Sequence, residues 1–283
     1  MKKTVLQRLE EEKGRLTPSQ KKVALYILKN PTEVAFLTME QFALKAKVSV
    51  ATIMRLAYQL GFSGYSDLQK EMQQSIRQQL EPHMQFAKGI SKIRKDDLLS
   101  KYAEQHIGNI QKTVSLLSIE ELNRAAKMVF EAEKVYLIGY RSSAAIANYL
   151  EDRMARIGID CEHLQGDTGR NQALLSRMNK KSLVLGISFP RYASPTIAMV
   201  QVAKSQGCKV IGITDHGQSP LGQLSDISLH CAFDSMVFHN SLISAFFVAD
   251  LLLLSIAGNY PKEVQENLEK IEKVIKEIKA NVL

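Results

Sequence analysis

Two short segments of the sequence bring hydroxyl and guanidinium groups together, each directly after an apolar run. Residues 139–143 read Gly-Tyr-Arg-Ser-Ser, and residues 188–196 read Ser-Phe-Pro-Arg-Tyr-Ala-Ser-Pro-Thr. Hydroxyls and the free N–H groups of a helix N-terminus bind anions, and a guanidinium binds two oxygens of a phosphate or carboxylate at once. The first segment lacks the GxGxxG pattern of dinucleotide sites. We therefore predict a site for a small anion, with the following ligand-binding residues: Arg141, Ser142, Ser143, Ser188, Arg191, Ser194 and Thr196.

A doubly wound α/β sheet would position both segments. Three almost continuously apolar segments are typical of parallel strands that are covered on both faces: residues 134–139, 182–188 and 209–214. Two weaker strands and two intervening helices are predicted over residues 160–164, 227–231, 142–157 and 195–206. Ser194 is predicted as the N-cap of the second of these helices, with Pro195 as its first residue. Ligands of such sheets bind beyond the carboxyl ends of the strands, where both segments fall.

The same half of the chain shows no recognisable catalytic group. Isomerisation of a small anionic substrate would need a base, usually Glu or His, near the carbon acid. Four histidines have no recognisable carboxylate partner in the sequence, and we expect them to be surface or hydrogen-bonded core residues: His163, His216, His230 and His239. No GxSxG, HExxH or Walker loop occurs. We predict no catalytic residue and no cofactor.

The three cysteines have no metal-ligand spacing, so we predict no metal site and a reducing compartment, the cytoplasm. The apolar stretch 245–257 is interrupted by Asp250 and is too short to span a bilayer, so we expect no membrane partner.

The positive charge of the chain is concentrated near its start. Residues 1–95 hold 17 Lys and Arg against 8 Asp and Glu, a balance of +9, whereas residues 96–283 hold 20 against 21. A charge that only keeps a protein soluble would be spread along the chain, but a nucleic-acid footprint is local. The first third of the chain is therefore expected to bind a polyanion, with a salt dependence that follows from counterion release.

This basic region has the pattern of a small helical bundle. Thr17 and Thr38 each precede a helical run and are followed three residues later by glutamine, which is a capping box. After a short turn, Ser49 can cap a helix that runs to Leu60, with Ile53, Leu56, Ala57 and Leu60 on its inner face.

The opposite face of that helix suits the major groove of DNA. Ala51 allows a close approach of the backbone, and Arg55 is long enough to reach base edges. Ser49 and Thr52 are expected to bond phosphate, while Lys45 and Lys47 would position the DNA backbone. The full set of predicted DNA-binding residues is Lys45, Lys47, Ser49, Ala51, Thr52, Arg55, Tyr58 and Gln59.

Two resemblances extend these predictions. The stretch VSVATIMRLAYQLGFSGYSDLQ, residues 48–69, resembles the helix-turn-helix signature of the RpiR family of bacterial transcription regulators. The second half resembles the sugar isomerase (SIS) domain, a phosphosugar-binding fold that accompanies this DNA-binding domain in that family; the segment TDHGQSPLGQLSDISL, residues 214–229, carries the likeness. The resemblance implies that Ser143 and Ser188 contact a phosphosugar. It also shows departures, because Arg141 replaces the second glycine of the usual G-x-G-x-S, and Pro190-Arg191 replaces a Ser-Gly pair.

We predict an α/β protein in which an all-α helix-turn-helix bundle, residues 1–80, is joined by a linker, residues 81–97, to a doubly wound, parallel-sheet α/β sandwich of SIS type, residues 98–283. The expected function is transcription regulation, in which double-stranded operator DNA is bound and a phosphorylated sugar or similar anion is sensed, without enzymatic turnover. Two alternatives remain open: a sugar phosphate isomerase with an accessory basic domain, and an RNA-binding or nucleoid protein.

A homodimer or higher homo-oligomer is expected, because palindromic operators are matched by two-fold proteins. The last predicted helix, which begins at Pro261, has an apolar stripe that either closes its own domain or packs on a second subunit: Val264, Leu268, Ile271, Ile275 and Ile278.

Overall fold

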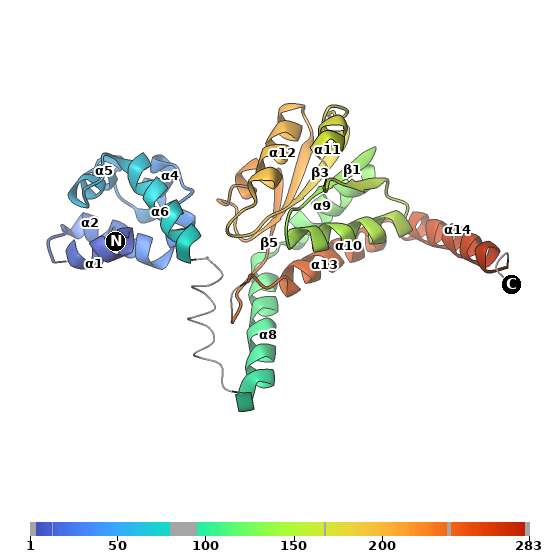
Figure 1. The fold of residues 1–283 in the computed structure, drawn as a ribbon, viewed down its shortest axis with the longest axis horizontal. Helices are drawn as coiled ribbons and strands as arrows, with labels where there is room; N and C mark the ends of the chain where they lie inside the picture. The colour runs from blue at the N-terminus through green and yellow to red at the C-terminus, as the bar shows by residue number, and fades with distance from the viewer. Residues whose placement is uncertain (1–3, 13, 80–94, 167, 237–238, 281–283) are drawn as a thin grey trace. The chain divides into compact units, whose positions relative to one another are not determined.

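The computed structural model describes residues 4–12, 14–79, 95–166, 168–236 and 239–280, which form two compact units (Figure 1). The first unit lies within residues 1–92 and the second within residues 93–283. The domain limits at residues 80 and 98 stay a prediction, because residues 81–94 of the predicted linker lie outside the described residues. Each unit has its own hydrophobic core and is described by itself.

The first unit is all-helical, as predicted. Its elements are α1 Val5–Glu12, α2 Pro18–Lys29, α3 Pro31–Val34, α4 Met39–Ala46, α5 Val50–Gln59 and α6 Tyr65–Gln79. Thr17 and Thr38 form full capping boxes with the glutamines three residues later, so the predicted starts of α2 and α4 are confirmed. The inner face of α5, predicted from its spacing, is buried: Ile53, Leu56 and Ala57 are each at most 1% exposed.

The second unit alternates strands and helices. Its helical elements are η1 Lys95–Asp97, α8 Leu98–Leu116, α9 Ile119–Glu131, α10 Ser143–Arg156, α11 Thr168–Leu175, α12 Ser194–Ser205, η2 Gly222–Leu224, α13 Ile243–Asn259 and α14 Pro261–Ala280. Its strands are β1 Lys134–Ile138, β2 Cys161–His163, β3 Ser182–Ile187, β4 Lys209–Thr214 and β5 Ile227–His230. All five predicted strands are therefore present, and no predicted strand end differs from the structure by more than one residue.

The strands form one parallel sheet in the order β2-β1-β3-β4-β5, with helices on both faces (Figure 1). Neighbouring residues of β1 point to opposite faces. Val135 and Leu137 pack with α9, α10 and α13, whereas Tyr136 and Ile138 pack with α11 and α12. The predicted doubly wound architecture is thus confirmed, and because strands are covered on both sides their sequences are almost entirely apolar.

One predicted cap differs from the structure. Ser194 is the first residue of α12 rather than its N-cap; Ala193 occupies the cap position, and no side chain caps the helix, so Pro195 is second in the helix. Helix α13 ends at Asn259, with Tyr260 in the C-cap position, before Pro261 opens α14.

In the described part of the chain no single helix has the length and hydropathy to cross a bilayer; α13 and α14 pass that test only when taken together, although they are bent by 105° at their junction.

Candidate functional site

The helix-turn-helix part of the first unit is built around Ser49. Its Oγ accepts a hydrogen bond from the backbone N–H of Thr52 at 3.3 Å and lies 3.0 Å from the Thr52 hydroxyl, which caps the start of α5 as predicted. Lys47, with φ of 53°, ends α4 in the left-handed conformation and turns the chain sharply toward Ser49. The short turn therefore fixes the direction in which α5 leaves α4.

The outer face of α5 is open. Ala51, Arg55 and Tyr58 are exposed, and Tyr58 is 55% exposed although its ring is large and apolar. Arg55 makes no hydrogen bond or ion pair with any other described residue. An exposed helix face with a small residue at its start and a long free cation one turn later is what a major-groove helix needs.

Two of the predicted DNA-binding residues already have partners inside the bundle. The Lys45 ammonium pairs with the Glu33 carboxylate. The Gln59 amide oxygen accepts a hydrogen bond from Gln20 at 2.8 Å, and its nitrogen donates to Glu12 at 3.4 Å. These side chains tie α4 and α5 to other helices of the bundle, so they are less available to DNA than Arg55.

Arg8, which the sequence did not single out, holds the other end of α5. Its guanidinium donates to the carbonyl of Leu60 at 2.7 Å and lies 4.7 Å from the centre of the Phe62 ring. Nothing in the local sequence signals this contact, because it joins residues that are 52 positions apart.

In the second unit, the order of the strands determines where a crevice forms. Chain connections leave β1 and β3 in opposite directions across the sheet, so β1 and β3 form the switch point at which a doubly wound sheet binds ligands. The two strands are paired up to Ile138 and Gly186. The loops that follow them, residues 139–142 and 188–193, therefore begin side by side and contain most of the predicted anion-binding residues.

The loop after β1 is tight. A Cβ on Gly139 would lie 2.8 Å from the backbone oxygen of Ser143, so only glycine fits where the strand turns into α10. Arg141 is exposed and has a φ of 58°, which is the left-handed region. Ser143 is 7% exposed in the first turn of α10, and Ser142 is exposed in the cap position without making a capping bond.

The loop after β3 is held from several sides. Thr214 donates its hydroxyl to the carbonyl oxygen of Ser188 at 2.7 Å, and Asn240 donates to the carbonyl oxygen of Pro190 at 3.1 Å. Tyr192 donates its hydroxyl to the Asp215 carboxylate at 2.9 Å. Burial raises the pKa of the Tyr192 hydroxyl far above its usual value, and the nearby Asp215 charge adds to this effect. These bonds stabilise Arg191, whose φ of 76° is also left-handed.

Two buried polar groups beside these loops have unused hydrogen-bonding capacity. Thr196, in the first turn of α12, is fully buried, and its hydroxyl has no hydrogen-bond partner among the described residues. Asn171 on α11 is fully buried as well; its nitrogen donates to the Tyr140 hydroxyl at 3.0 Å, but its oxygen is unpaired within the described chain. Buried groups of this kind are normally satisfied, by protein, water or a ligand. The sequence did not indicate Asn171, since no motif contains it.

Comparisons with known proteins agree with this architecture. Residues 3–79 match the model of the helix-turn-helix domain of the rpiR family, and residues 128–255 match that of the SIS domain. An uncharacterised HTH-type transcriptional regulator of Caldanaerobacter subterraneus is 29% identical, with 98% of this chain and 99% of that protein covered. The HTH-type transcriptional regulator RpiR of Escherichia coli K12 is 24% identical over 83% of this chain and 81% of its own length.

The chain belongs to the RpiR family of helix-turn-helix transcriptional regulators. Among solved structures, the Vibrio vulnificus NanR protein complexed with ManNAc-6P is 25% identical and covers 96% of this chain and 98% of its own, with a TM-score of 0.66. A sugar isomerase domain of an RpiR transcription factor from Sphaerobacter thermophilus, 24% identical, covers 62% of this chain and 99% of its own with a TM-score of 0.61, which supports the fold of the second unit.

Two of the departures from the SIS pattern that the second unit resembles fall on left-handed residues. Arg141 and Arg191, which stand where the pattern has glycine, are two of the four non-glycine residues with positive φ in the described chain. For an L-residue this conformation costs roughly 1–2 kcal/mol. Neither guanidinium has a hydrogen bond or ion pair with another described residue. Both arginines thus keep a backbone shape suited to glycine while adding a free positive charge.

The histidines of this RpiR protein divide into two kinds. His163 is 1% exposed, and its ring bonds to the Asn148 amide oxygen at 2.7 Å and to the Gly139 carbonyl at 3.3 Å; its burial lowers its pKa. It is a hydrogen-bonded core residue, as predicted. His216 differs from it, because its Nε2 lies 3.4 Å from the carboxylate of the adjacent Asp215, yet neither of its ring nitrogens has a hydrogen-bond partner among the described residues.

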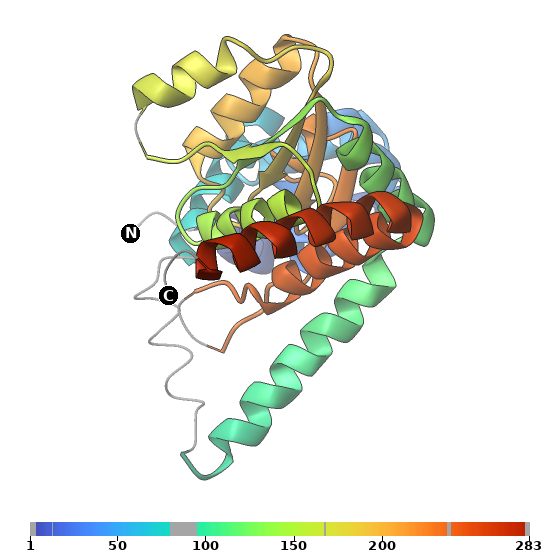
Figure 2. The same ribbon diagram turned by 90° about the vertical axis from the view of Figure 1, so that its right-hand side faces the viewer.

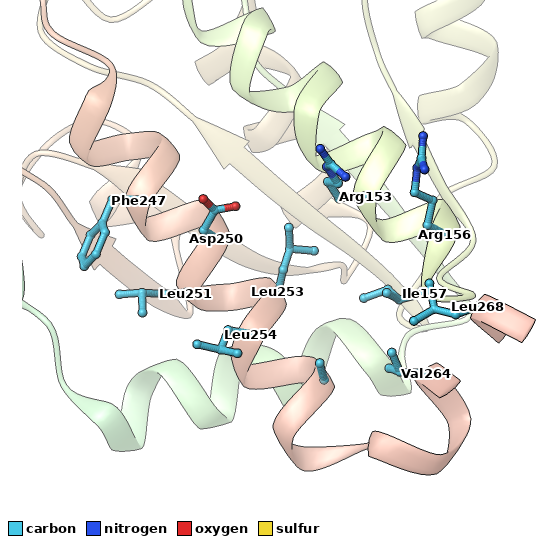
Figure 3. A pocket seen from close by; sticks show the side chains of 11 residues that line it. Arg153, Arg156, Ile157, Phe247, Asp250, Leu251, Leu253, Leu254, Val264 and Leu268 are labelled. Carbon is cyan, nitrogen blue, oxygen red and sulfur yellow. The ribbon is translucent and has the colours of Figure 1, made fainter. Parts of the chain in front are cut away.

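An apolar groove lies outside the predicted anion site. No group of three or more His, Cys, Asp or Glu side chains within the described ranges could hold a metal ion. An apolar groove of about 500 Å³ lies between α10, α13 and α14, with Arg153, Arg156 and Asp250 at its edge (Figure 3). It contains none of the predicted ligand-binding residues.

Proposed function

We propose that this regulator binds operator DNA as a homodimer and that its SIS domain senses a phosphorylated sugar or a related anion. The proposal assigns DNA binding to residues 1–80, the connection to residues 81–97 and sensing to residues 98–283. A protein that binds the chromosome and responds to such a metabolite acts in the cytoplasm.

One observation carries the DNA part of the proposal: Arg55 is exposed and unpaired within the described chain on the face of α5 that points away from the bundle. We assign Arg55 to base edges, because a guanidinium can donate two hydrogen bonds to guanine. Ala51 allows α5 to approach the groove, and Tyr58 extends the contact along it. Ser49, Thr52 and Lys47 are assigned to phosphates, which fix the register of the protein on the duplex.

Lys45 and Gln59 have secondary roles in this proposal. To reach a phosphate, Lys45 must leave Glu33, and Gln59 must leave Gln20 and Glu12. Exposed ion pairs contribute only about 0–1 kcal/mol, so Lys45 can exchange its partner at small cost.

The effector part is supported by the two loops at the switch point. Ser188 is buried at the start of the loop after β3, Ser143 is buried where α10 begins, and the N-termini of α10 and α12 provide free N–H groups. We assign the phosphate to these groups together with Thr196, whose buried hydroxyl needs a partner. Ser142 and Ser194 lie at the exposed edge, where they bond the remaining oxygens. The full-length similarity to NanR, a protein solved with ManNAc-6P, supports this chemical class.

We assign the two left-handed arginines to ligand selection. Arg141 and Arg191 would bind the negative charges of the effector from the open side of the crevice, since guanidinium–phosphate bonds are charge-assisted and short. Effector binding would favour one arrangement of the dimer and change the spacing of its two recognition helices. A coupling of about 1–3 kcal/mol is typical of allosteric regulators and changes DNA occupancy by about 5- to 150-fold.

The test is a gel shift of the full protein on the DNA upstream of its own gene, with and without a panel of aldose, ketose and amino-sugar phosphates. We expect binding that weakens with salt and changes with at least one sugar phosphate. Arg55→Ala should lose about 1–3 kcal/mol at one base position, whereas equal loss on every sequence would show that Arg55 touches only phosphate. Unchanged DNA binding across the panel would refute the effector part and leave the DNA part standing.

We further propose that the SIS domain binds its ligand without turnover. His163, the most deeply buried histidine near the crevice, has one ring nitrogen bonded to Asn148 and the other to the Gly139 carbonyl, so neither nitrogen is free to take a proton from a substrate. Incubation of the full chain with aldose and ketose phosphates should leave them unchanged. Interconversion of any pair would favour the isomerase alternative.

A further inference from the structure

The last helix has the spacing of a coiled-coil seam. In α14, Val264, Leu268, Ile271, Ile275 and Ile278 are separated by four, three, four and three residues. This strict alternation is the a/d pattern by which two helices pack along each other, and it is narrower than the apolar face of a helix that packs on a globular core.

The structure covers only the start of this seam. Val264 is 6% exposed where α14 contacts α10 and α13, but Leu268 is 44% and Ile278 57% exposed. Beyond its first turns α14 runs past the edge of the sheet domain (Figure 1), and in Figure 2, which faces that side, it is seen in front of α13. The apolar groove of Figure 3 adjoins the base of the seam, because Val264 and Leu268 line it together with residues of α10 and α13.

The charges beside the seam select its partner. The polar faces of α14 hold five lysines and five glutamates, so the helix has no excess charge that would favour an anionic membrane or a nucleic acid. Next to the d positions Ile271 and Ile278 stand Glu272 and Lys279, which are opposite in sign and seven residues apart. Neither forms an ion pair with another described residue.

We propose that α14 pairs with α14 of a second copy, antiparallel and centred near Ile275. In this arrangement Glu272 of each copy faces Lys279 of the other, so one two-fold contact makes two ion pairs. A parallel pairing would not bring these residues together. Within α14 the pairing covers Ile271, Ile275 and Ile278, and it directs the end of each helix toward the groove at the base of the other. It rests on the proposed function only in taking the regulator to be a dimer, and it adds the surface that makes it one.

Charge reversal in the full chain tests the pairing. Sedimentation equilibrium should give a mass twice 31.7 kDa for the wild type. Glu272→Lys and Lys279→Glu should each weaken dimerisation about tenfold, because each places two like-charged pairs at the contact. The double variant Glu272→Lys/Lys279→Glu restores both pairs and should regain the wild-type dissociation constant. Both residues are exposed, so folding is not at risk.

A second pair of variants separates the seam from general surface hydrophobicity. Ile278→Glu, in the seam, should abolish the dimer, whereas Val202→Glu, at a 44% exposed site on α12, should leave it intact. The proposal is overturned if the wild type is a monomer, if the double variant does not recover, or if only Ile107→Glu on the exposed side of α8 dissociates the dimer. DNA binding and the response to sugar phosphates are measured separately. If either is absent while the charge-reversal variants behave as expected, the proposed function is refuted and the α14 pairing stands.

Discussion

Replacing Arg141 by glycine should make the protein more stable and a poorer sensor. The φ of 58° costs an arginine roughly 1–2 kcal/mol, and glycine removes this cost. Glycine also increases the freedom of the unfolded chain, which offsets about 0.5–1 kcal/mol of the gain. The net increase in unfolding free energy is therefore about 0.5–1 kcal/mol. For a unit of this size it corresponds to a rise of about 1–4 °C in Tm.

The effect on ligand binding has the opposite sign. Arg141 makes no hydrogen bond or ion pair with other described residues, so its guanidinium is free to bind an effector phosphate. A hydrogen bond to a charged group contributes about 1.5–3 kcal/mol, and at this exposed site we take the lower end, which is about tenfold in affinity. Arg141→Lys is the matched control, because it keeps both the charge and the Cβ.

The assay combines differential scanning calorimetry with isothermal titration of the sugar phosphate that gives the largest thermal shift. We expect Arg141→Gly to raise Tm and to weaken binding, and Arg141→Lys to leave Tm unchanged and to weaken binding less. A fall in Tm would show that the left-handed backbone is not strained by arginine. A rise in Tm with unchanged affinity would show that Arg141 does not contact the ligand. Arg191→Gly, at a φ of 76°, should behave in the same way.

Three further changes test the local arguments. Ser49→Ala removes the cap of α5 and should lower the unfolding free energy of the first unit by about 1 kcal/mol in urea titrations, with weaker DNA binding in gel shifts. Gly139→Ala places a Cβ 2.8 Å from the Ser143 carbonyl and should destabilise the second unit, whereas Gly108→Ala, with open space around it on α8, should be neutral or stabilising. Burial lowers the pKa of His163 in the folded chain, so as the pH falls the unfolded chain binds a proton at His163 before the folded chain does. The unfolding free energy should therefore fall as the pH drops below about 6.5, and it should fall less steeply in His163→Gln.

Most of the fold could be predicted because helix caps and strands are determined by residues that lie close together in the sequence. The capping boxes at Thr17 and Thr38 involve residues three positions apart, and the strands are short apolar runs between polar turns. The wrong cap at Ser194 shows the limit of this reasoning. A serine before a proline fits the cap pattern, but the chain enters α12 one residue earlier, through the left-handed pair Arg191 and Tyr192.

The contacts that hold the two sites join distant parts of the chain, and the sequence could not predict them. Tyr192 bonds to Asp215, and Asn240 bonds to the carbonyl of Pro190, 50 residues away. Likewise, pairing of Gln59 with Gln20 depends on how α5 packs on α2. The helical position of Gln59 is compatible both with contact to DNA and with a bond to another helix, so the sequence alone predicted the DNA contact. In the structure the packing of α5 on α2 places Gln59 beside Gln20.

Helix α10 connects the two sites that the proposals concern. Ser143 opens it at the crevice, and Arg156, which lines the groove beside α14, ends it after 14 residues, a length of about 20 Å. If an anion bound at the N-terminus of α10 moves this helix as a rigid body, its C-terminal end moves too, and that end contacts the start of α14. Because each dimer binds two effectors, saturating effector changes the dimer dissociation constant by the square of the factor by which dimerisation changes effector affinity at one site. Sedimentation with saturating sugar phosphate and titration of the wild-type dimer and the Ile278→Glu monomer measure the two factors. A dimer dissociation constant that does not change with effector would show that α10 does not link the sites.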